Sequence, residues 1–335
     1  MSGVAARMRT PVTGALRDIQ EPVRSRLDDV VAEMQRIVTD NLPIIREVSA
    51  HLLQMRGKMF RPTLALLSSA AAGKPEARAT ALGAVVELMH LATLVHDDSV
   101  DHSVLRRGLP TVNSLFSHQV SVIMGDFLYT RAHAALVDVG DLEFLRILTA
   151  VANELTIGEM RQLGAIEGLD FSEDDYFALI RAKTAVLISS ACETGALCGA
   201  SRYRSALARY GELLGMAFQI ADDILDYTSN SSVTGKPSGL DLREHKVTLP
   251  LILVRPHLSP ASRARVEELF ATENPDDQII SDVVAIVADA GGIERAHQRG
   301  ERFAQEAEEA LAPLPDSPVR SALTDAISYV MDRRS

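Results

Sequence analysis

Apolar residues recur at steps of three and four along most of this 335-residue chain, which is the spacing of one face of an α-helix. Alternating runs of β-branched residues, which are typical of strands, are scarce. The pattern predicts helices over residues 22–40, 60–72, 76–102, 119–138, 141–164, 173–199, 203–229 and 278–312. The segments between them contain Gly or Pro but are too short for interdomain linkers, as at 71–76, 106–113, 229–239 and 255–260. We therefore expect an all-α fold with a single domain over residues 1–335, of which residues 1–20 are disordered.

Charge and cysteine content narrow the possible partners and compartments. The formal net charge is −11 and the pI is near 5.3, whereas a general nucleic-acid-binding protein needs a basic surface. The two cysteines, Cys192 and Cys198, point in different directions on a helix, which favours reduced core thiols over a disulfide. No apolar signal-peptide core is found near the N-terminus, and Glu87 and His90 interrupt the most apolar stretch. We expect a soluble, cytoplasmic protein without a nucleic-acid partner.

The segment ATLVHDDSVD (92–101) runs from apolar sequence directly into three carboxylates. On a helix, Asp97 and Asp101 share one face, whereas Asp98 points about 100° away. Like charges at this spacing repel one another and cost stability. Taken alone, this DDxxD motif fits a solvated helix end as well as a cation site built from carboxylate oxygens.

A second segment, FQIADDILD (218–226), repeats the same spacing with Asp222, Asp223 and Asp226. If the two helices face one cavity, several negative charges meet there, and they require cations between them. Mg²⁺ usually combines a few carboxylates with waters and substrate phosphates. The repeated motif therefore predicts a polyphosphate ligand that is bridged by Mg²⁺.

Basic residues stand close to both acidic segments. Each one alone is most simply a surface cation, but beside two acidic clusters we interpret them as clamps for diphosphate groups. Lys58 and Arg61 in GKMFRP are three residues apart and would share a face if that segment is helical. The other candidates are Arg106, Arg107, Lys183 (followed by Thr184), Lys236 and Lys246.

In order along the chain, GKMFRP, HDDSVDHSVLRRG, GDFLYTRA, GEMRQL, KTA, FQIADDILD and GK…DLREHKVTLP resemble the trans-polyprenyl diphosphate synthase family. The resemblance covers about residues 50–255 and is to the long-chain, hexa- to decaprenyl type. It implies a bundle of antiparallel helices around a deep central cavity, usually in a homodimer. The implied reaction adds isopentenyl diphosphate head-to-tail to an allylic diphosphate such as farnesyl diphosphate. The resemblance further implies three Mg²⁺ ions in the substrate-bound enzyme and a peripheral membrane contact when the product leaves.

The resemblance also implies residue roles, with Asp97, Asp101, Lys183 and Asp222 as catalytic residues. The implied Mg²⁺ ligands are Asp97, Asp101, Asp222 and Asp226. The allylic diphosphate would be held by Arg106, Lys183, Thr184, Gln219, Lys236 and Lys246. Isopentenyl diphosphate would be held by Lys58, Arg61, His90 and Arg107. The sequence departs from the family at His245, where many relatives have Gly, and a bulky side chain there is expected to shift Lys246.

The residues before Asp97 bear on the length of the product. One helical face carries Asp97, Thr93, Met89 or His90, Val86 and Leu82, and we expect the growing hydrocarbon to run along it. Ala92 and Thr93 are small where short-chain relatives often have aromatic residues, so the resemblance implies a long all-trans product. A farnesyl or geranylgeranyl product is the alternative, in which this face packs in the core.

Three other functions fit the acidic motifs less well. A class I terpene cyclase normally has a second metal motif of the NSE type and does not need the Lys58 and Arg61 pair. A non-catalytic subunit of a heteromeric synthase has usually lost one acidic cluster. A purely structural helical protein leaves the repeated carboxylates unexplained.

Overall fold

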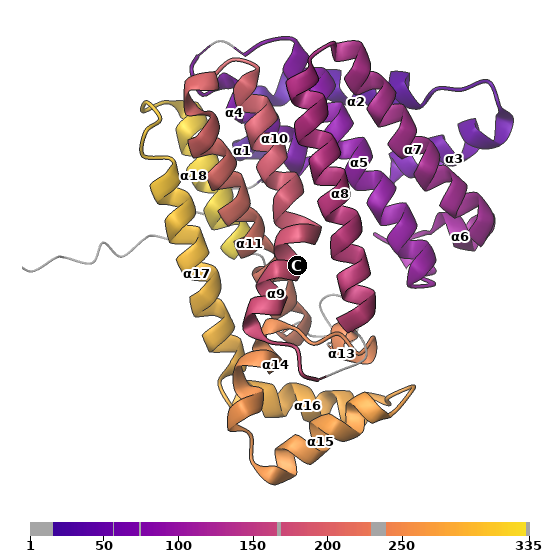
Figure 1. Ribbon diagram of the computed structural model, residues 1–335, viewed down its shortest axis with the longest axis vertical. Helices are drawn as coiled ribbons and strands as arrows, with labels where there is room; N and C mark the ends of the chain where they lie inside the picture. Colours follow the sequence, from indigo (N-terminus) through magenta and orange to yellow (C-terminus); the bar gives the residue numbers. More distant parts are fainter. Residues whose placement is uncertain (1–15, 56, 74, 166–168, 229–238, 333–335) are drawn as a thin grey trace, which may run out of the picture.

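The computed structural model describes residues 16–332, apart from residues 56, 74, 166–168 and 229–238. The described chain is helical almost throughout (Figure 1), with one antiparallel pair of two-residue strands, β1 (Leu105–Arg106) and β2 (Leu109–Pro110). Its first helices are α1 (Leu16–Gln20), α2 (Arg24–Val38), α3 (Pro43–Gln54), α4 (Phe60–Ala70), α5 (Arg78–Val100), α6 (Val112–Leu115), α7 (His118–Val139), α8 (Leu142–Ala165) and α9 (Glu173–Ile180). A π-helical turn, η2 (Arg181–Ala185), follows α9 directly. The later helices are α10 (Val186–Leu197), α11 (Arg204–Thr228), α13 (Leu240–Arg243), α14 (Leu249–Val254), α15 (Pro260–Ala271), α16 (Asp277–Asp289), α17 (Gly292–Ala310) and α18 (Pro318–Met331).

The helices expected from the periodicity are confirmed, although two of the expected segments are divided and other helices, such as α3 and α18, lie outside the expected ranges. The segment 173–199 is interrupted by the π turn, and the segment 278–312 is two helices that meet at Gly291, which has a left-handed φ of 76°. The expectation that residues 1–20 are disordered is wrong for residues 16–20. These residues form α1, because Ile19 is fully buried against the core and anchors the turn.

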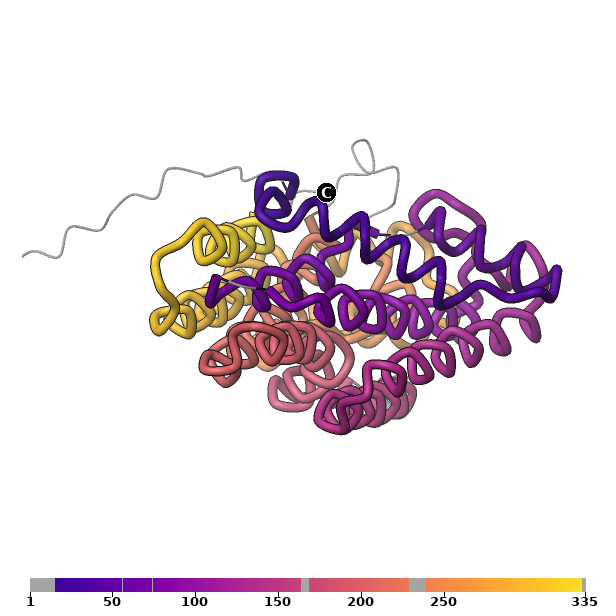
Figure 2. The backbone as a smooth tube through the Cα atoms, turned by 90° about the horizontal axis from the view of Figure 1, so that it is seen from above, coloured from indigo at the N-terminus to yellow at the C-terminus, as the bar shows by residue number. Residues whose placement is uncertain are grey.

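The long helices pack side by side into one bundle, and α14, α15 and α16 lie across its lower end in Figure 1. Short connections make α7 and α8, α10 and α11, and α17 and α18 sequential neighbours. Viewed from above in Figure 2, α2 (indigo) runs alongside α5 (purple), which it contacts. Helix α5 also contacts α4, α7 and α10, so it is surrounded by other helices.

This central position explains the composition of α5. It is the one described helix that is long and apolar enough to cross a membrane, but 67% of its most apolar window is buried inside the protein. A core helix passes the same test of length and hydropathy, because it is apolar around its whole circumference. Helix α5 is therefore a core helix whose C-terminal end carries Asp97, Asp98 and, just beyond it, Asp101.

Candidate active site

A cavity of about 1020 Å³ lies among these helices and receives residues from both acidic segments. The predicted site residues that line it are Lys58, Arg61, His90, Asp97, Arg106, Arg107, Lys183, Thr184, Gln219, Asp222 and Lys246. Asp101 and Asp226 do not line it, and Lys236 lies outside the described residues. The structure therefore brings together residues that are up to nearly two hundred positions apart in the chain.

Asp97 stands where negative charge is concentrated. Its side chain lines the cavity near the end of α5, and burial raises its pKa to about 7. The negative charges of Glu159 and Asp101 raise this pKa further, whereas Lys183 and Arg106 lower it. Glu159, on α8, also lines the cavity; it belongs to the segment GEMRQL, but the sequence alone gave it no role. A cation beside Asp97 would relieve this repulsion.

Asp98 points away from Asp97, as the helical spacing predicts, and has a different role. Its side chain is buried, and its Oδ1 accepts a hydrogen bond from Nε of Arg106 at 2.7 Å. Burial raises the pKa of Asp98, and the charge of Arg106 opposes this shift. The pair therefore fixes Arg106 of β1 at the rim of the first acidic cluster.

The second acidic cluster divides in the same way. Asp222 lines the cavity, whereas Asp223 is buried and accepts hydrogen bonds from Tyr176 Oη (2.7 Å) and Gln219 Nε2 (2.9 Å). Burial raises the pKa of Asp223 to about 7, and these two hydrogen bonds oppose the shift. Asp226 accepts hydrogen bonds from the backbone N–H groups at the start of α13, of Leu240 (3.0 Å) and Asp241 (3.1 Å).

The π turn gives two consecutive residues to the cavity wall. Lys183 Nζ contacts Gln162 Oε1 (2.5 Å) and Glu159 Oε1 (2.9 Å), and Thr184 Oγ1 donates to Gln219 Oε1 (2.8 Å). A turn of π-helix holds one residue more than a turn of α-helix, so it shifts the side-chain directions locally. Helix α11 can approach the turn closely because Gly215 has no side chain. A Cβ at this position would lie only 2.5 Å from Ala185 Cα.

A second group of cations lines the cavity beside a buried carboxylate, Glu87. Nε of Arg61 is buried without a hydrogen-bond partner within the described structure. Burial lowers the pKa of the Arg61 guanidinium, and the charge of Glu87 opposes this shift. The pKa of His90 is held well below its usual value by burial and then by the charges of Arg61 and Arg107, so its ring is neutral. A guanidinium with a free N–H donor and a neutral imidazole are suited to an anion.

A shared helical face for Lys58 and Arg61 depended on a helix that includes both residues. Helix α4 begins at Phe60, after Met59 in a left-handed conformation (φ 54°), so Lys58 and Arg61 do not share a helical face. Both residues nevertheless line the cavity. Arg107 reaches it from the turn between β1 and β2, with its own left-handed φ of 53°, and donates from Nη1 to Met55 O (2.7 Å).

The donor set fits magnesium but forms no closed metal cage. Within the described ranges, no three or more His, Cys, Asp or Glu side chains are grouped so that they could hold a metal ion by themselves. Two carboxylates from different helices, Asp97 and Asp222, do face one cavity that is also lined by several cations. Mg²⁺ is commonly bound by one or two carboxylates together with waters and substrate phosphates.

The face expected to guide the hydrocarbon is only partly open. Thr93, His90 and Leu94 line the cavity, whereas Met89, Val86 and Leu82 are buried in the main core. The expectation that one face carries the whole path is therefore wrong beyond Thr93 and His90 in this structure. Neighbouring helices cover these residues of the same face, a result that the helical spacing alone could not decide.

His245 occupies a position that favours glycine, since its φ is 55°. Its Nε2 lies 3.0 Å from Thr272 O, and its ring centroid is 5.8 Å from that of Phe270. Lys246 still lines the cavity, and its Nζ donates to Glu244 Oε2 at 2.6 Å. The imidazole thus connects the loop that carries Lys246 to α15 and the residue that follows it.

Glycine and alanine at position 245 should separate backbone strain from side-chain contact. Both variants lose the contacts with Thr272 and Phe270, but only His245→Gly relieves the left-handed backbone. We expect the free energy of unfolding of His245→Gly to exceed that of His245→Ala by about 1 kcal/mol. Urea denaturation of the two variants measures this difference, and an alanine variant as stable as the glycine variant would contradict it.

Comparisons with known proteins extend the similarity beyond the motifs. A family model described as polyprenyl synthetase matches residues 42–287. The chain is 37% identical over 319 residues to the all-trans-nonaprenyl-diphosphate synthase (geranyl-diphosphate specific) of Rhodobacter capsulatus, covering 95% of this chain and 98% of that protein. It is 34% identical over 320 residues to the octaprenyl diphosphate synthase of Escherichia coli K12, covering 95% and 99%. The crystal structure of a polyprenyl synthase from Caulobacter crescentus CB15, complexed with calcium and isoprenyl diphosphate, matches with a TM-score of 0.91 at 31% identity, covering 98% of this chain and 100% of that one.

Proposed function

The chain belongs to the polyprenyl synthetase family, and from this membership we propose how its cavity is used. The protein is a prenyltransferase with the all-α isoprenoid synthase fold, and it makes a long-chain all-trans polyprenyl diphosphate. Its substrates are isopentenyl diphosphate and an allylic diphosphate. The observation that carries this proposal is that Asp97 and Asp222 face one cavity together with two separate groups of cations.

The first group of cations belongs to the allylic diphosphate. Mg²⁺, with three ions in the substrate-bound enzyme, would be held by Asp97, Asp101, Asp222 and Asp226, and when bound it neutralises charge on a departing diphosphate. Arg106, Lys183 and Lys246 would add positive charge around the allylic diphosphate, and Thr184 and Gln219 would orient it. Lys236 is the remaining residue proposed to hold this diphosphate. The chain of hydrogen bonds from Thr184 through Gln219 to Asp223 holds these side chains in place before substrate arrives.

The second group of cations belongs to isopentenyl diphosphate. Lys58, Arg61, His90 and Arg107 would hold its diphosphate, with the free Nε of Arg61 as one donor. The allylic C–O bond breaks first, the double bond of isopentenyl diphosphate attacks the resulting carbocation, and a proton is lost to the released diphosphate. Apolar side chains such as Leu94, Leu155 and Ile180 line the same cavity and exclude water from the cation.

The direct test is to incubate the purified protein with farnesyl diphosphate, labelled isopentenyl diphosphate and Mg²⁺, and to measure the chain length of the products. We expect labelled products in the hexa- to decaprenyl range. A cyclised hydrocarbon formed without isopentenyl diphosphate would indicate a cyclase, and products that stop at fifteen or twenty carbons would indicate a short-chain synthase. The absence of any labelled product would contradict the proposal.

The adjacent arginines should affect different substrates, because Arg106 pairs with Asp98 beside the acidic cluster, whereas the Arg107 guanidinium lies against Gly57, next to Lys58. Loss of a hydrogen bond to a charged group corresponds to roughly 10- to 100-fold in affinity. We expect Arg107→Ala to raise KM for isopentenyl diphosphate by this factor, and Arg106→Ala to raise KM for the allylic diphosphate. Steady-state kinetics with each substrate varied in turn measure both, with Arg146→Ala on the exposed side of α8 as the control. Indistinguishable defects in the two variants would contradict this division.

We also propose that the protein is one cytoplasmic domain that forms a homodimer and touches a membrane only peripherally, on product release. Exposed apolar residues on α7 and α8 support a protein partner, notably Ile123 (67% exposed), Leu142 (66%) and Met160 (65%). A surface of this kind on two neighbouring helices favours burial against a second copy. The two helices are seen together on one side of the bundle in Figure 1.

A further inference from the structure

Lys58 has an unusual environment for a cation at an anion site. Its Nζ makes no ion pair with any carboxylate in the part of the chain that the structure describes. Instead, Nζ lies 5.7 Å from the centroid of the Tyr329 ring, within the range of a cation–π interaction. Tyr329 belongs to α18 and is far in sequence from every motif quoted above. Its side chain also lines the cavity.

The Tyr329 ring is held by other aromatic rings. Its centroid is 5.9 Å from that of Phe60, which in turn is 6.0 Å from that of Phe218. These three rings belong to α18, α4 and α11. Phe218 immediately precedes Gln219, which is proposed to hold the allylic diphosphate. Helix α18 is itself fixed to α11, because Tyr210 Oη donates to Leu323 O at 2.7 Å. The ring therefore has little freedom to leave the ammonium group.

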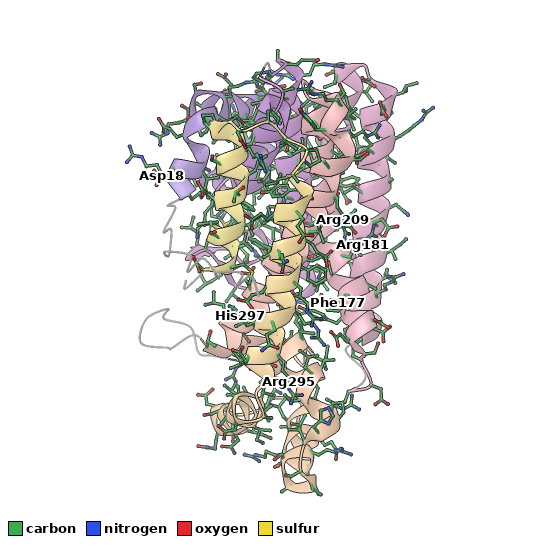
Figure 3. The ribbon with its side chains drawn as sticks, turned by 90° about the vertical axis from the view of Figure 1, so that its left-hand side faces the viewer. Asp18, Phe177, Arg181, Arg209, Arg295 and His297 are labelled. Carbon is green, nitrogen blue, oxygen red and sulfur yellow. The ribbon has the colours of Figure 1, made fainter. Side chains whose placement is uncertain are left out.

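The backbone of Lys58 is fixed from a different part of the chain. Gln20 Nε2, at the end of α1, donates to Lys58 O (2.9 Å) and lies 3.1 Å from Thr63 Oγ1. Thr63 Oγ1 donates to the carbonyl of Met59, the left-handed residue between Lys58 and α4. Helices α1 and α18 contact each other, and Figure 3 shows α1, labelled at Asp18, beside the yellow helices of the C-terminal region. Segments from near both ends of the chain thus converge on one lysine.

We propose that Tyr329 is a positioning residue for Lys58 in the binding of isopentenyl diphosphate, an inference that rests on the proposed function. An extended lysine side chain loses much rotamer freedom when it is fixed, and this loss weakens the binding of an anion. The face of an aromatic ring attracts the ammonium group but carries no net charge. A carboxylate in the same place would compete with the diphosphate, whereas Tyr329 orients Lys58 and leaves its full charge for the substrate.

The test compares Tyr329→Leu with Tyr329→Phe, which keeps the aromatic face. A cation–π interaction corresponds to roughly 2- to 30-fold in affinity. We expect Tyr329→Leu to raise KM for isopentenyl diphosphate by this factor, with kcat and the KM for the allylic diphosphate little changed, and Tyr329→Phe to behave like the wild type. Tyr203→Leu is the matched control, because Tyr203 is also partly buried and lies under a cation, Arg202, at 4.6 Å. Equal increases in both KM values, or no increase, would overturn the proposal.

A double-mutant cycle separates positioning from general packing. In the Lys58→Gln background, Tyr329→Leu should cause no further loss in the binding of isopentenyl diphosphate, measured by isothermal titration calorimetry. A loss as large as that in the wild-type background would show that Tyr329 acts by packing alone and would overturn the inference. Calorimetry needs no turnover, so failure of the proposed reaction and failure of this inference give different results.

Discussion

Asp97→Ala and Asp222→Ala should each lower kcat/KM by roughly 10²- to 10⁴-fold, because each removes a carboxylate that helps to stabilise the departing diphosphate. Helical content should not change. In the protein without bound cations, burial and neighbouring carboxylates raise the pKa of Asp97. Replacing Asp97 with alanine therefore removes an unfavourable charge. The melting temperature of Asp97→Ala without Mg²⁺ should therefore stay the same or rise slightly.

Steady-state kinetics and circular dichroism on the same preparations measure both effects. Asp289→Ala is the matched control, because Asp289 is exposed at the end of α16 and lies outside the cavity lining. The control should keep wild-type kinetics. Near-normal turnover in either Asp97→Ala or Asp222→Ala would remove that carboxylate from the proposed metal site.

Thr93→Phe should change the main product from a long chain to a short one while turnover is kept. Thr93 lines the cavity one helical turn before Asp97, and its Oγ1 donates to His90 O at 2.8 Å. One helical turn advances about 5.4 Å, which is comparable to one isoprene unit. A phenylalanine ring at this position would therefore occupy the space next to the first units of a growing chain.

Thr93→Ser is the control for this experiment, because it retains the hydroxyl group and adds no bulk. Product extraction and chromatography should show the wild-type length for serine and a shorter chain for phenylalanine. Ala92→Phe should also shorten the product, but Ala92 is only 1% exposed, so the ring should in addition lower stability by about 1–3 kcal/mol through overpacking. An unchanged product length in both phenylalanine variants would exclude this end of α5 as the determinant.

The sequence predicted those parts of the fold and site that depend on local spacing. Apolar residues at helical intervals located the long helices, and the repeat of DDxxD identified Asp97 and Asp222 as residues of one cavity. Helical geometry alone predicted that Asp98 points away from Asp97. The ion pair between Asp98 and Arg106 agrees with this prediction. Such features can be predicted because the helix fixes which residues share a face.

Features that depend on contacts between distant segments could not be predicted. Glu87 looks like an interruption of an apolar helix, and only the fold shows that it is the buried carboxylate beside Arg61. Tyr329 belongs to no quoted motif, and its contact with Lys58 requires the packing of α18 on α4. The left-handed φ of Met59 could not be predicted, because hydrophobic periodicity does not encode a single backbone conformation, whereas α4 begins at Phe60 as expected.

The π turn at residues 181–185 makes this site sensitive to the number of residues as well as to their identity. Deletion of one residue there would allow α9 and α10 to join as one continuous α-helix. Because the π turn holds the additional residue within a single turn, the two helices would keep nearly the same rotation relative to each other. Tyr176, on α9, would stay within reach of Asp223, whereas the side chains of Lys183 and Thr184, within the turn, would point in new directions. A one-residue deletion in this short segment should therefore preserve the packing of the helices and chiefly impair the binding of the allylic diphosphate.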